Sequence, residues 1–108
     1  MSARLPTGVL VSALLRRVND SGGFGAVLAK GDAQGGGMLV LIVARGAATR
    51  VLERGLGADG DTALIDSTPV GDVGDYCRRR RARDPDLWVI ELDSPEAERF
   101  TAETILPR

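Results

Sequence analysis

The longest apolar run of the sequence is Met38-Leu39-Val40-Leu41-Ile42-Val43-Ala44, which lies between Gly35-Gly36-Gly37 and Arg45-Gly46. A run of this length suits a β-strand and is too short for an independent helix, and its Val and Ile residues favour an extended backbone. Apolar and polar residues do not alternate along it, so both faces of the strand must be covered. We therefore expect residues 38–44 to form a central, buried strand of a sheet.

Apolar periodicity and turn residues predict further elements on either side of this strand. Before it we expect a helix over Thr7–Asn19, with the apolar stripe Leu10, Val11, Leu14, Leu15 and Val18, and a strand over Phe24–Lys30. After it we expect strands over Thr49–Arg54 and Thr62–Asp66, a helix over Val73–Arg83, a strand over Leu87–Leu92 and a helix that begins near Ser94. The predicted fold class is α+β, a single domain over residues 1–108 with a mainly antiparallel sheet of about five strands and three helices, in the order α-β-β-β-β-α-β-α.

Capping residues predict where the helices begin. Thr7 is expected to cap the first helix and Asp72 the second, because their side-chain oxygens can accept hydrogen bonds from free backbone N–H groups. Ser94-Pro95 predicts that the last helix is capped by Ser94 and has Pro95 at its first position.

The pairing of the strands is predicted from their polarity. Residues 24–30 and 38–44 are expected to form an antiparallel hairpin across the glycine-rich segment 31–37. The charged strand 49–54 is expected to face solvent, as charged residues do in exposed edge regions. The strand 87–92 is nearly as apolar as residues 38–44, so we expect it inside the sheet or alongside residues 24–30.

The composition restricts the possible functions. The chain of 108 residues has 14 basic and 15 acidic residues, a net charge of -1, so no global field attracts nucleic acid or anionic lipid. It has no histidine, which removes the commonest general base and metal ligand. Its one cysteine, Cys77, excludes an internal disulfide. No apolar run approaches the roughly 20 residues that span a bilayer, and no signal-peptide core is present. We expect a cytoplasmic protein without membrane contact.

One segment links the sequence to a known family. The block Asp84-Pro85-Asp86-Leu87-Trp88-Val89-Ile90-Glu91-Leu92-Asp93 resembles the bacterial domain-of-unknown-function 1491 family, whose members have about this length. The resemblance extends to the opening Arg4-Leu5-Pro6-Thr7, to Leu14-Leu15-Arg16-Arg17 and to the arginine run before Asp84, and so covers most of the chain. It implies no activity, ligand or catalytic residue.

The candidate binding residues are the basic side chains at the end of the second predicted helix: Arg78, Arg79, Arg80, Arg81 and Arg83. Steps of 100° per residue spread them around the helix axis, so we expect at least two of them to remain exposed. Arginines at a helix end offset the dipole, and those in excess suit phosphate, nucleic acid or an acidic protein surface.

Two further groups of residues are candidate sites of chemistry. Five neighbouring acids are compatible with a divalent metal: Asp84, Asp86, Glu91, Asp93 and Glu96. Turn, strand and helix-start positions explain them better. Cys77 precedes the arginines, which would lower the pKa of its thiol, but its place on the helix favours a core position. We predict no catalytic, metal-binding or cofactor-binding residue and no cofactor.

These observations favour a small, non-enzymatic binding domain whose partner is another protein or a second copy of the chain, as a homodimer. A module that binds a polyanion, nucleic acid or phosphate, through the same arginines is the alternative. An enzyme that uses carboxylates and a divalent metal is the least favoured hypothesis.

Overall fold

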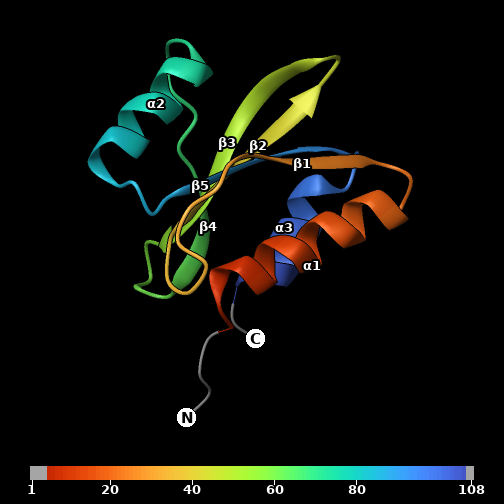
Figure 1. The fold of residues 1–108 in the computed structure, drawn as a ribbon, viewed down its shortest axis with the longest axis horizontal. Coiled ribbons are helices and arrows are strands. Elements are labelled where there is room, and N and C mark those ends of the chain that lie inside the picture. Colours follow the sequence, from red (N-terminus) through yellow and green to blue (C-terminus); the bar gives the residue numbers. More distant parts are fainter. Residues whose placement is uncertain (1–4, 107–108) are drawn as a thin grey trace.

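The computed structural model describes residues 5–106, which form eight helices and strands. In chain order these are α1 (Thr7–Asp20), β1 (Phe24–Ala29), β2 (Met38–Ala44), β3 (Ala47–Leu56), β4 (Thr62–Asp66), α2 (Val73–Arg83), β5 (Trp88–Asp93) and α3 (Ala97–Ile105) (Figure 1). The predicted class, element order and five-stranded, mostly antiparallel sheet are confirmed. Arg4, the first residue of the segment Arg4-Leu5-Pro6-Thr7, lies outside the described residues. Within residues 5–106, no helix is long and apolar enough to cross a membrane.

Strand β5 lies in the interior of the sheet. The strand order is β1-β5-β2-β3-β4, and β5 is antiparallel to β1 and parallel to β2. The predicted position of residues 87–92, inside the sheet and beside β1, is confirmed. The predicted hairpin of β1 with β2 is wrong, because β5 separates the two strands. Burial explains this order: β2 and β5 are the two continuously apolar strands, and pairing them directly, with Val40 beside Ile90, covers both.

The glycine-rich segment 31–37 caps α1. The carbonyl oxygens of Gln34 and Ala33 accept hydrogen bonds from Thr7 N at 3.2 Å and Gly8 N at 2.8 Å. These bonds satisfy two of the N–H groups that the first turn of a helix leaves free. The prediction that Thr7 caps the helix with its side chain is therefore wrong. Its hydroxyl, buried, instead donates to a carbonyl of the same segment at 2.6 Å.

Two glycines let this segment lie directly on the turn before β5. A Cβ on Gly31 or on Gly36 would lie 2.1 Å or 2.0 Å from the carbonyl oxygen of Asp86, so only glycine fits at either position. The Trp88 indole N–H donates to the Asp32 carbonyl at 2.8 Å, which satisfies the one polar atom of a buried side chain. The segment is a packed part of the structure rather than a free connection.

Helices cover both faces of the sheet (Figure 1). The face that we call the α1/α3 face packs against α1 and α3, around Leu10, Leu14, Val18, Val40, Leu52, Ile90, Leu92 and Phe100. This core contains the predicted apolar stripe of the first helix, with Leu15 partly buried. The opposite face, which we call the α2 face, packs against α2 around Leu39, Leu41, Val51, Cys77, Leu87 and Val89.

Burial decreases along β2 toward its C-terminal end. Residues 38–41 are buried, Ile42 and Val43 are half-buried, and Ala44 is exposed. The strand then enters a two-residue turn in which Arg45 and Gly46 both have positive φ, 54° and 80°. This is the backbone of the turns that best match the twist of a hairpin. The expectation that both faces of the strand are covered therefore holds for its first half.

Strand β3 is an interior strand, between β2 and β4, so its predicted exposed position is wrong. Its charged side chains bind groups on neighbouring elements. Arg50 forms an ion pair with Asp66 of β4, and Arg54 donates to the Ile105 carbonyl of α3 at 2.9 Å. Glu53 contacts α2. These charges join β3 to three other elements. In the sequence alone, charged residues that are paired in this way look the same as charged residues that face solvent.

The last helix begins two residues later than predicted. Glu96 occupies the capping position of α3, and Pro95 precedes the helix. Ser94 Oγ accepts a hydrogen bond from Glu96 N at 3.2 Å and closes the turn that leads into the helix. The predicted cap and first position, Ser94 and Pro95, are therefore wrong. The side-chain cap predicted for Asp72 of α2 is confirmed, because its carboxylate accepts a hydrogen bond from Asp75 N at 2.8 Å.

Two residues on one face of β2 test the central-strand assignment. Val40 is completely buried and Ala44 is exposed. Val40→Asp should prevent folding, because an unpaired buried carboxylate costs several kcal/mol, which is comparable with the whole stability of a small domain. Ala44→Asp should melt within a few degrees of the parent protein. Thermal melting followed by circular dichroism checks both, and a cooperative, parent-like transition in Val40→Asp would contradict the assignment.

Candidate functional site

The candidate site is built on α2, which lies on the sheet by one narrow side. Cys77 is the buried residue of this helix, with Val73 and Tyr76 packed beside it on the α2 face. Burial raises the pKa of the Cys77 thiol above its ordinary value, an effect that outweighs the nearby positive charges of Arg80 and Arg78. Cys77 is thus a core side chain, as its position in the sequence favoured, and a poor thiolate.

Arg80 holds α2 against β3. Its guanidinium donates two hydrogen bonds of 2.8 Å to the Glu53 carboxylate and one of 2.6 Å to the Tyr76 hydroxyl. The bond from Arg80 lowers the pKa of Glu53 below its ordinary value, although burial acts in the opposite direction. The side chains of Arg80 and Glu53 are 31% and 19% exposed, so this bidentate pair is partly shielded from water.

Arg81 holds the end of α2 against the segments beside it. Its guanidinium donates to the carbonyl oxygen of Leu87 at 3.0 Å and to that of Lys30 at 3.1 Å. These carbonyls belong to the turn before β5 and to the residue that follows β1, so one side chain joins three parts of the chain. Of the five candidate arginines, Arg80 and Arg81 are therefore engaged within the molecule.

The other three candidate arginines, Arg78, Arg79 and Arg83, are exposed, which agrees with the expectation that at least two would be. Arg78 pairs with Asp75 one turn away, but both side chains are more than half exposed, at 72% and 57%. Among residues 5–106, neither Arg79 nor Arg83 has an ion-pair partner. The arginine run is thus divided between structural and solvent-facing side chains.

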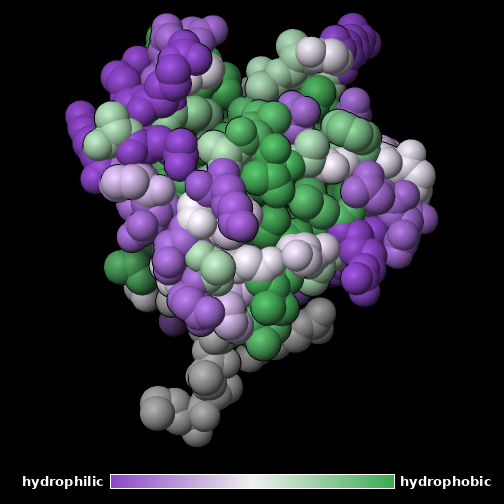
Figure 2. All heavy atoms as spheres, in the orientation of Figure 1, coloured by the Kyte–Doolittle hydropathy of each residue, from purple (hydrophilic) through white to green (hydrophobic). Residues whose placement is uncertain are grey.

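An apolar surface lies next to these arginines. Phe24 and Leu28 of β1 are 57% and 53% exposed. Figure 2 shows hydrophobic side chains gathered in the middle of this view, beside the hydrophilic surface of α2 on the left. β1 is an edge strand, and none of its six residues is charged, although charge is a common protection of exposed edges.

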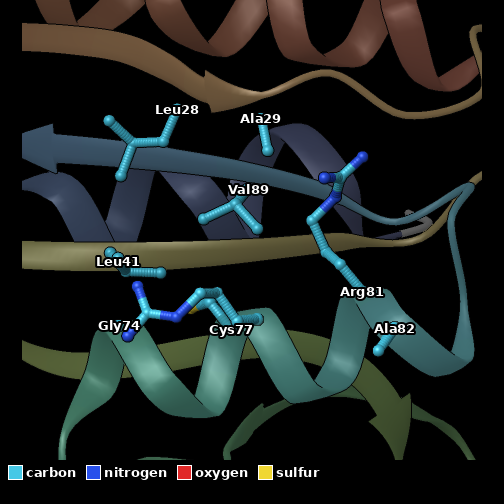
Figure 3. A pocket seen from close by; sticks show the side chains of 9 residues that line it. Leu28, Ala29, Leu41, Gly74, Cys77, Arg81, Ala82 and Val89 are labelled. Atoms are coloured by element: carbon cyan, nitrogen blue, oxygen red, sulfur yellow. The ribbon is translucent and has the colours of Figure 1, made fainter.

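A groove of about 510 Å³ separates α2 from β1. Its sheet side is formed by Leu28, Ala29, Leu41 and Val89, and its helix side includes Gly74, Cys77 and Ala82 (Figure 3). Arg78 and Arg81 complete the helix side. The absence of large side chains at positions 74 and 82 leaves this space open. Arg78 and Arg81 were among the candidates from the sequence, whereas the apolar and small residues of the groove were not. The signals in the sequence that point to them are the absence of charge in residues 24–29 and the small residues Gly74 and Ala82 of the helix.

A second cavity, of about 260 Å³, lies between the start of α1 and the ends of α2 and α3. It contains Glu53, Arg54 and Arg80, whose charged groups already bind one another or backbone carbonyls. No group of three or more Cys, Asp or Glu side chains within residues 5–106 is arranged to hold a metal ion. Of these two cavities, the α2 groove is the one that combines exposed arginine with a mostly apolar lining.

The Glu53–Arg80 pair predicts a pH-dependent stability. Because the pKa of Glu53 is lowered in the folded state, its contribution is present above the unfolded pKa of about 4.3 and is lost as pH falls through the lower, folded value. Glu53→Gln should lower the free energy of unfolding by about 1–2 kcal/mol at neutral pH. This is at the low end for hydrogen bonds to charged groups, because Arg80 retains contact with water. Urea unfolding should show that the difference in free energy of unfolding between the parent protein and Glu53→Gln decreases below about pH 4.

Asp75→Asn provides the control, because it removes a carboxylate from an exposed pair on the same helix. Its unfolding midpoint should stay close to that of the parent protein. If Glu53→Gln lowered the free energy of unfolding by the same amount at neutral and acidic pH, an ionic role for Glu53 would be contradicted.

Comparisons with known proteins agree with this fold. The family model described as "Protein of unknown function (DUF1491)" matches residues 5–102. A crystal structure of a DUF1491 family protein from Caulobacter crescentus CB15 is 33% identical, with a TM-score of 0.76 over 90% of this chain and 94% of that one. An NMR structure of a DUF1491 family protein from the same organism is 35% identical, with a TM-score of 0.73 over 92% and 94%.

Protein Atu0922 from A. tumefaciens, solved in solution, shares the fold at 24% identity, with a TM-score of 0.72 over 98% of both chains. No match was found among curated protein sequences. The family match spans nearly the whole described chain, including the block 84–93, the α2 arginines and the groove. The chain therefore belongs to the DUF1491 family of proteins of unknown function.

Proposed function

We propose that this chain is a non-enzymatic protein-binding domain whose binding surface is α2 and the groove beside it. The observation that supports this most is the division of the arginine run. Arg80 and Arg81 fix the helix in place, whereas Arg78, Arg79 and Arg83 extend into solvent next to an open apolar surface. Apolar surface with exposed arginine at its margin is the composition of protein interfaces.

The exposed arginines are more than the stability of α2 requires. Cations in the last turn offset the helix dipole, a need that Arg80 and Arg81 already meet. Arg79 and Arg83 are four residues apart, so their like charges disfavour the helix slightly. A partner with acidic side chains would relieve this repulsion and gain charge-assisted hydrogen bonds from the guanidinium groups. The charge thus favours an acidic protein surface.

The aromatic side chains favour a protein over a nucleic acid. Binding of single strands commonly uses exposed aromatic rings on which bases stack. Here Trp88 and Phe100 are buried, and Tyr76 is half-buried and bonded to Arg80, which leaves Phe24 as the exposed ring among residues 5–106. The net charge of -1 also gives little attraction to phosphates.

The test is the double variant Arg78→Gln/Arg79→Gln. Its melting temperature should change by only a few degrees, because both sites are exposed. Its affinity for the partner should fall about tenfold or more, since each lost charge-assisted contact is worth roughly 1.5–3 kcal/mol. Affinity capture from lysate of the source organism, with mass spectrometry and then titration of the purified partner, measures this effect.

The matched control is Arg16→Gln/Arg45→Gln, which removes two exposed arginines outside α2. It has the same net charge as the α2 double variant. Retention of every parent partner by the α2 variant would refute the proposal. Capture of nucleic acid, with a salt dependence that falls by about one unit for each arginine removed, would replace it with the polyanion-binding function.

A further inference from the structure

The two outer strands of the sheet, β1 and β4, differ in how their free edges are closed. At β1, the Asn19 side chain accepts a hydrogen bond from Gly25 N at 3.1 Å and donates one to Gly25 O at 3.5 Å. The register of β1 also shifts between Val27 and Ala29, and an irregularity of this kind interrupts the row of edge groups. The β1 edge is therefore occupied near one end and irregular near the other.

The edge of β4 has no such closure. Ser67 N, just after the strand, donates to Val51 O of β3 at 2.9 Å, which fixes the alternation of the backbone groups. In an antiparallel strand every second residue bonds to the same neighbour, so Thr62, Leu64 and Asp66 direct their N–H and C=O groups away from β3. Among residues 5–106, these outward groups have no backbone hydrogen-bond partner. The β4 edge is thus a regular row of free donors and acceptors.

The sequence of β4, Thr62-Ala63-Leu64-Ile65-Asp66, complements itself when two copies run antiparallel. With a two-fold axis at Leu64, each Thr62 lies opposite Asp66 of the other copy, so the hydroxyl can donate to the carboxylate. Each Ala63 lies opposite Ile65, so a small side chain faces a large one. Thr62, Leu64 and Asp66 are the hydrogen-bonded positions of this register, and every outward edge group gains a partner.

The same pairing covers apolar surface at the open side of β4. Leu64 packs against the core beneath α1 and α3 but is only partly buried. Leu56 of β3 lies diagonally across from Leu64 and is 75% exposed. A second copy places its own Leu64 directly beside this one, at the distance at which cross-strand side chains pack. The edge therefore gains apolar contact as well as backbone hydrogen bonds.

The charges of β4 permit this pairing. Asp66 is its one charged residue, and Asp66 Oδ2 accepts one hydrogen bond, from Arg50 at 3.2 Å. That oxygen can therefore accept a second bond, from the Thr62 hydroxyl of the other copy. The two Asp66 carboxylates lie four residues apart along the strands, about 13 Å, which exceeds the screening length of roughly 8 Å in physiological salt. Asp61, beside Thr62, is the nearest like charge, and its repulsion of Asp66 weakens the contact.

We propose that the chain forms a symmetric homodimer through β4, in which the sheets of the two copies join edge to edge. The occupant is a second copy because β4 is complementary to itself along its whole length. A contact between two strands of this length is smaller than a standard interface, so the dissociation constant should lie between about 10 μM and 1 mM. The α2 groove lies beside β1, at the opposite edge of the sheet, so the dimer is independent of the function proposed for that surface.

Two substitutions at Thr62 test the register. Thr62→Lys places a cation opposite Asp66 of the other copy and should lower the dissociation constant about three- to tenfold, because the symmetry supplies the pair twice. Thr62→Asp places two acids opposite each other and should raise the dissociation constant by a similar factor. Sedimentation equilibrium of the purified protein, from about 10 μM to 1 mM, measures both. A lysine on a strand edge ordinarily opposes pairing, so strengthening by Thr62→Lys is specific to this register.

Thr49→Lys and Thr49→Asp are the matched controls. Thr49 is also an exposed threonine of a strand, and it lies outside the part of β3 that pairs with β4. These variants make the same changes in net charge and should leave the dissociation constant unchanged. Thr62 is exposed, so its two variants should melt within a few degrees of the parent protein, which separates lost association from lost folding.

NMR of a mixture of isotope-labelled and unlabelled protein locates the contact. The Cα protons of Ala63 in one copy and Ile65 in the other should show an intermolecular Overhauser effect, because these residues form the close, non-hydrogen-bonded pairs of the register. A monomer mass at every concentration up to about 1 mM would overturn the proposal. A dimer whose intermolecular contacts fall on β1 or α2, or one that Thr62→Lys and Thr62→Asp both weaken, would also overturn it.

Discussion

The structure depends on the parallel pairing of β2 with β5. These strands place Leu39 beside Val89 and Val40 beside Ile90, and all four side chains are almost completely buried. Parallel neighbours cannot be joined by a tight turn, so the chain must leave β2, form β3, β4 and α2, and return to β5. This path puts α2 on the face opposite α1 and α3, and it displaces β1 to the edge. The groove beside α2 is thus a consequence of where β5 enters the sheet.

The sequence predicted the elements more reliably than their arrangement. Periodicity and turn residues predicted the bounds of the strands and the starts of the helices to within two residues, because they reflect local backbone preference and the side that is buried. The neighbour of β2 was predicted wrongly as β1, since Phe24–Ala29 and Trp88–Asp93 are both apolar enough to pair with it. The charged residues of β3 were also misjudged. Arg50 and Glu53 find their partners on α3 and α2, far along the chain, and no local signal distinguishes such a pair from two exposed charges.

The candidate site was predictable in part for a geometric reason. Five arginines within six positions of a helix cannot all face one surface, so some had to be exposed. Which of them are engaged depends on tertiary contacts: Arg80 meets Glu53, and Arg81 meets the Leu87 carbonyl. The groove was not predictable, because it is defined by missing bulk at Gly74 and Ala82 and by the edge position of β1.

The central claim is that the groove between α2 and β1 is open in the free protein and available to a partner. Methyl relaxation in the presence of a neutral, soluble paramagnetic chelate measures this directly. The account predicts strong enhancement at Leu28, moderate enhancement at Ala29, weak enhancement at Leu41, and almost none at Leu39 and Val51, in the order of their exposure. Protection of Leu28 equal to that of Leu39 in the protein alone would contradict it, because the groove would then already be covered.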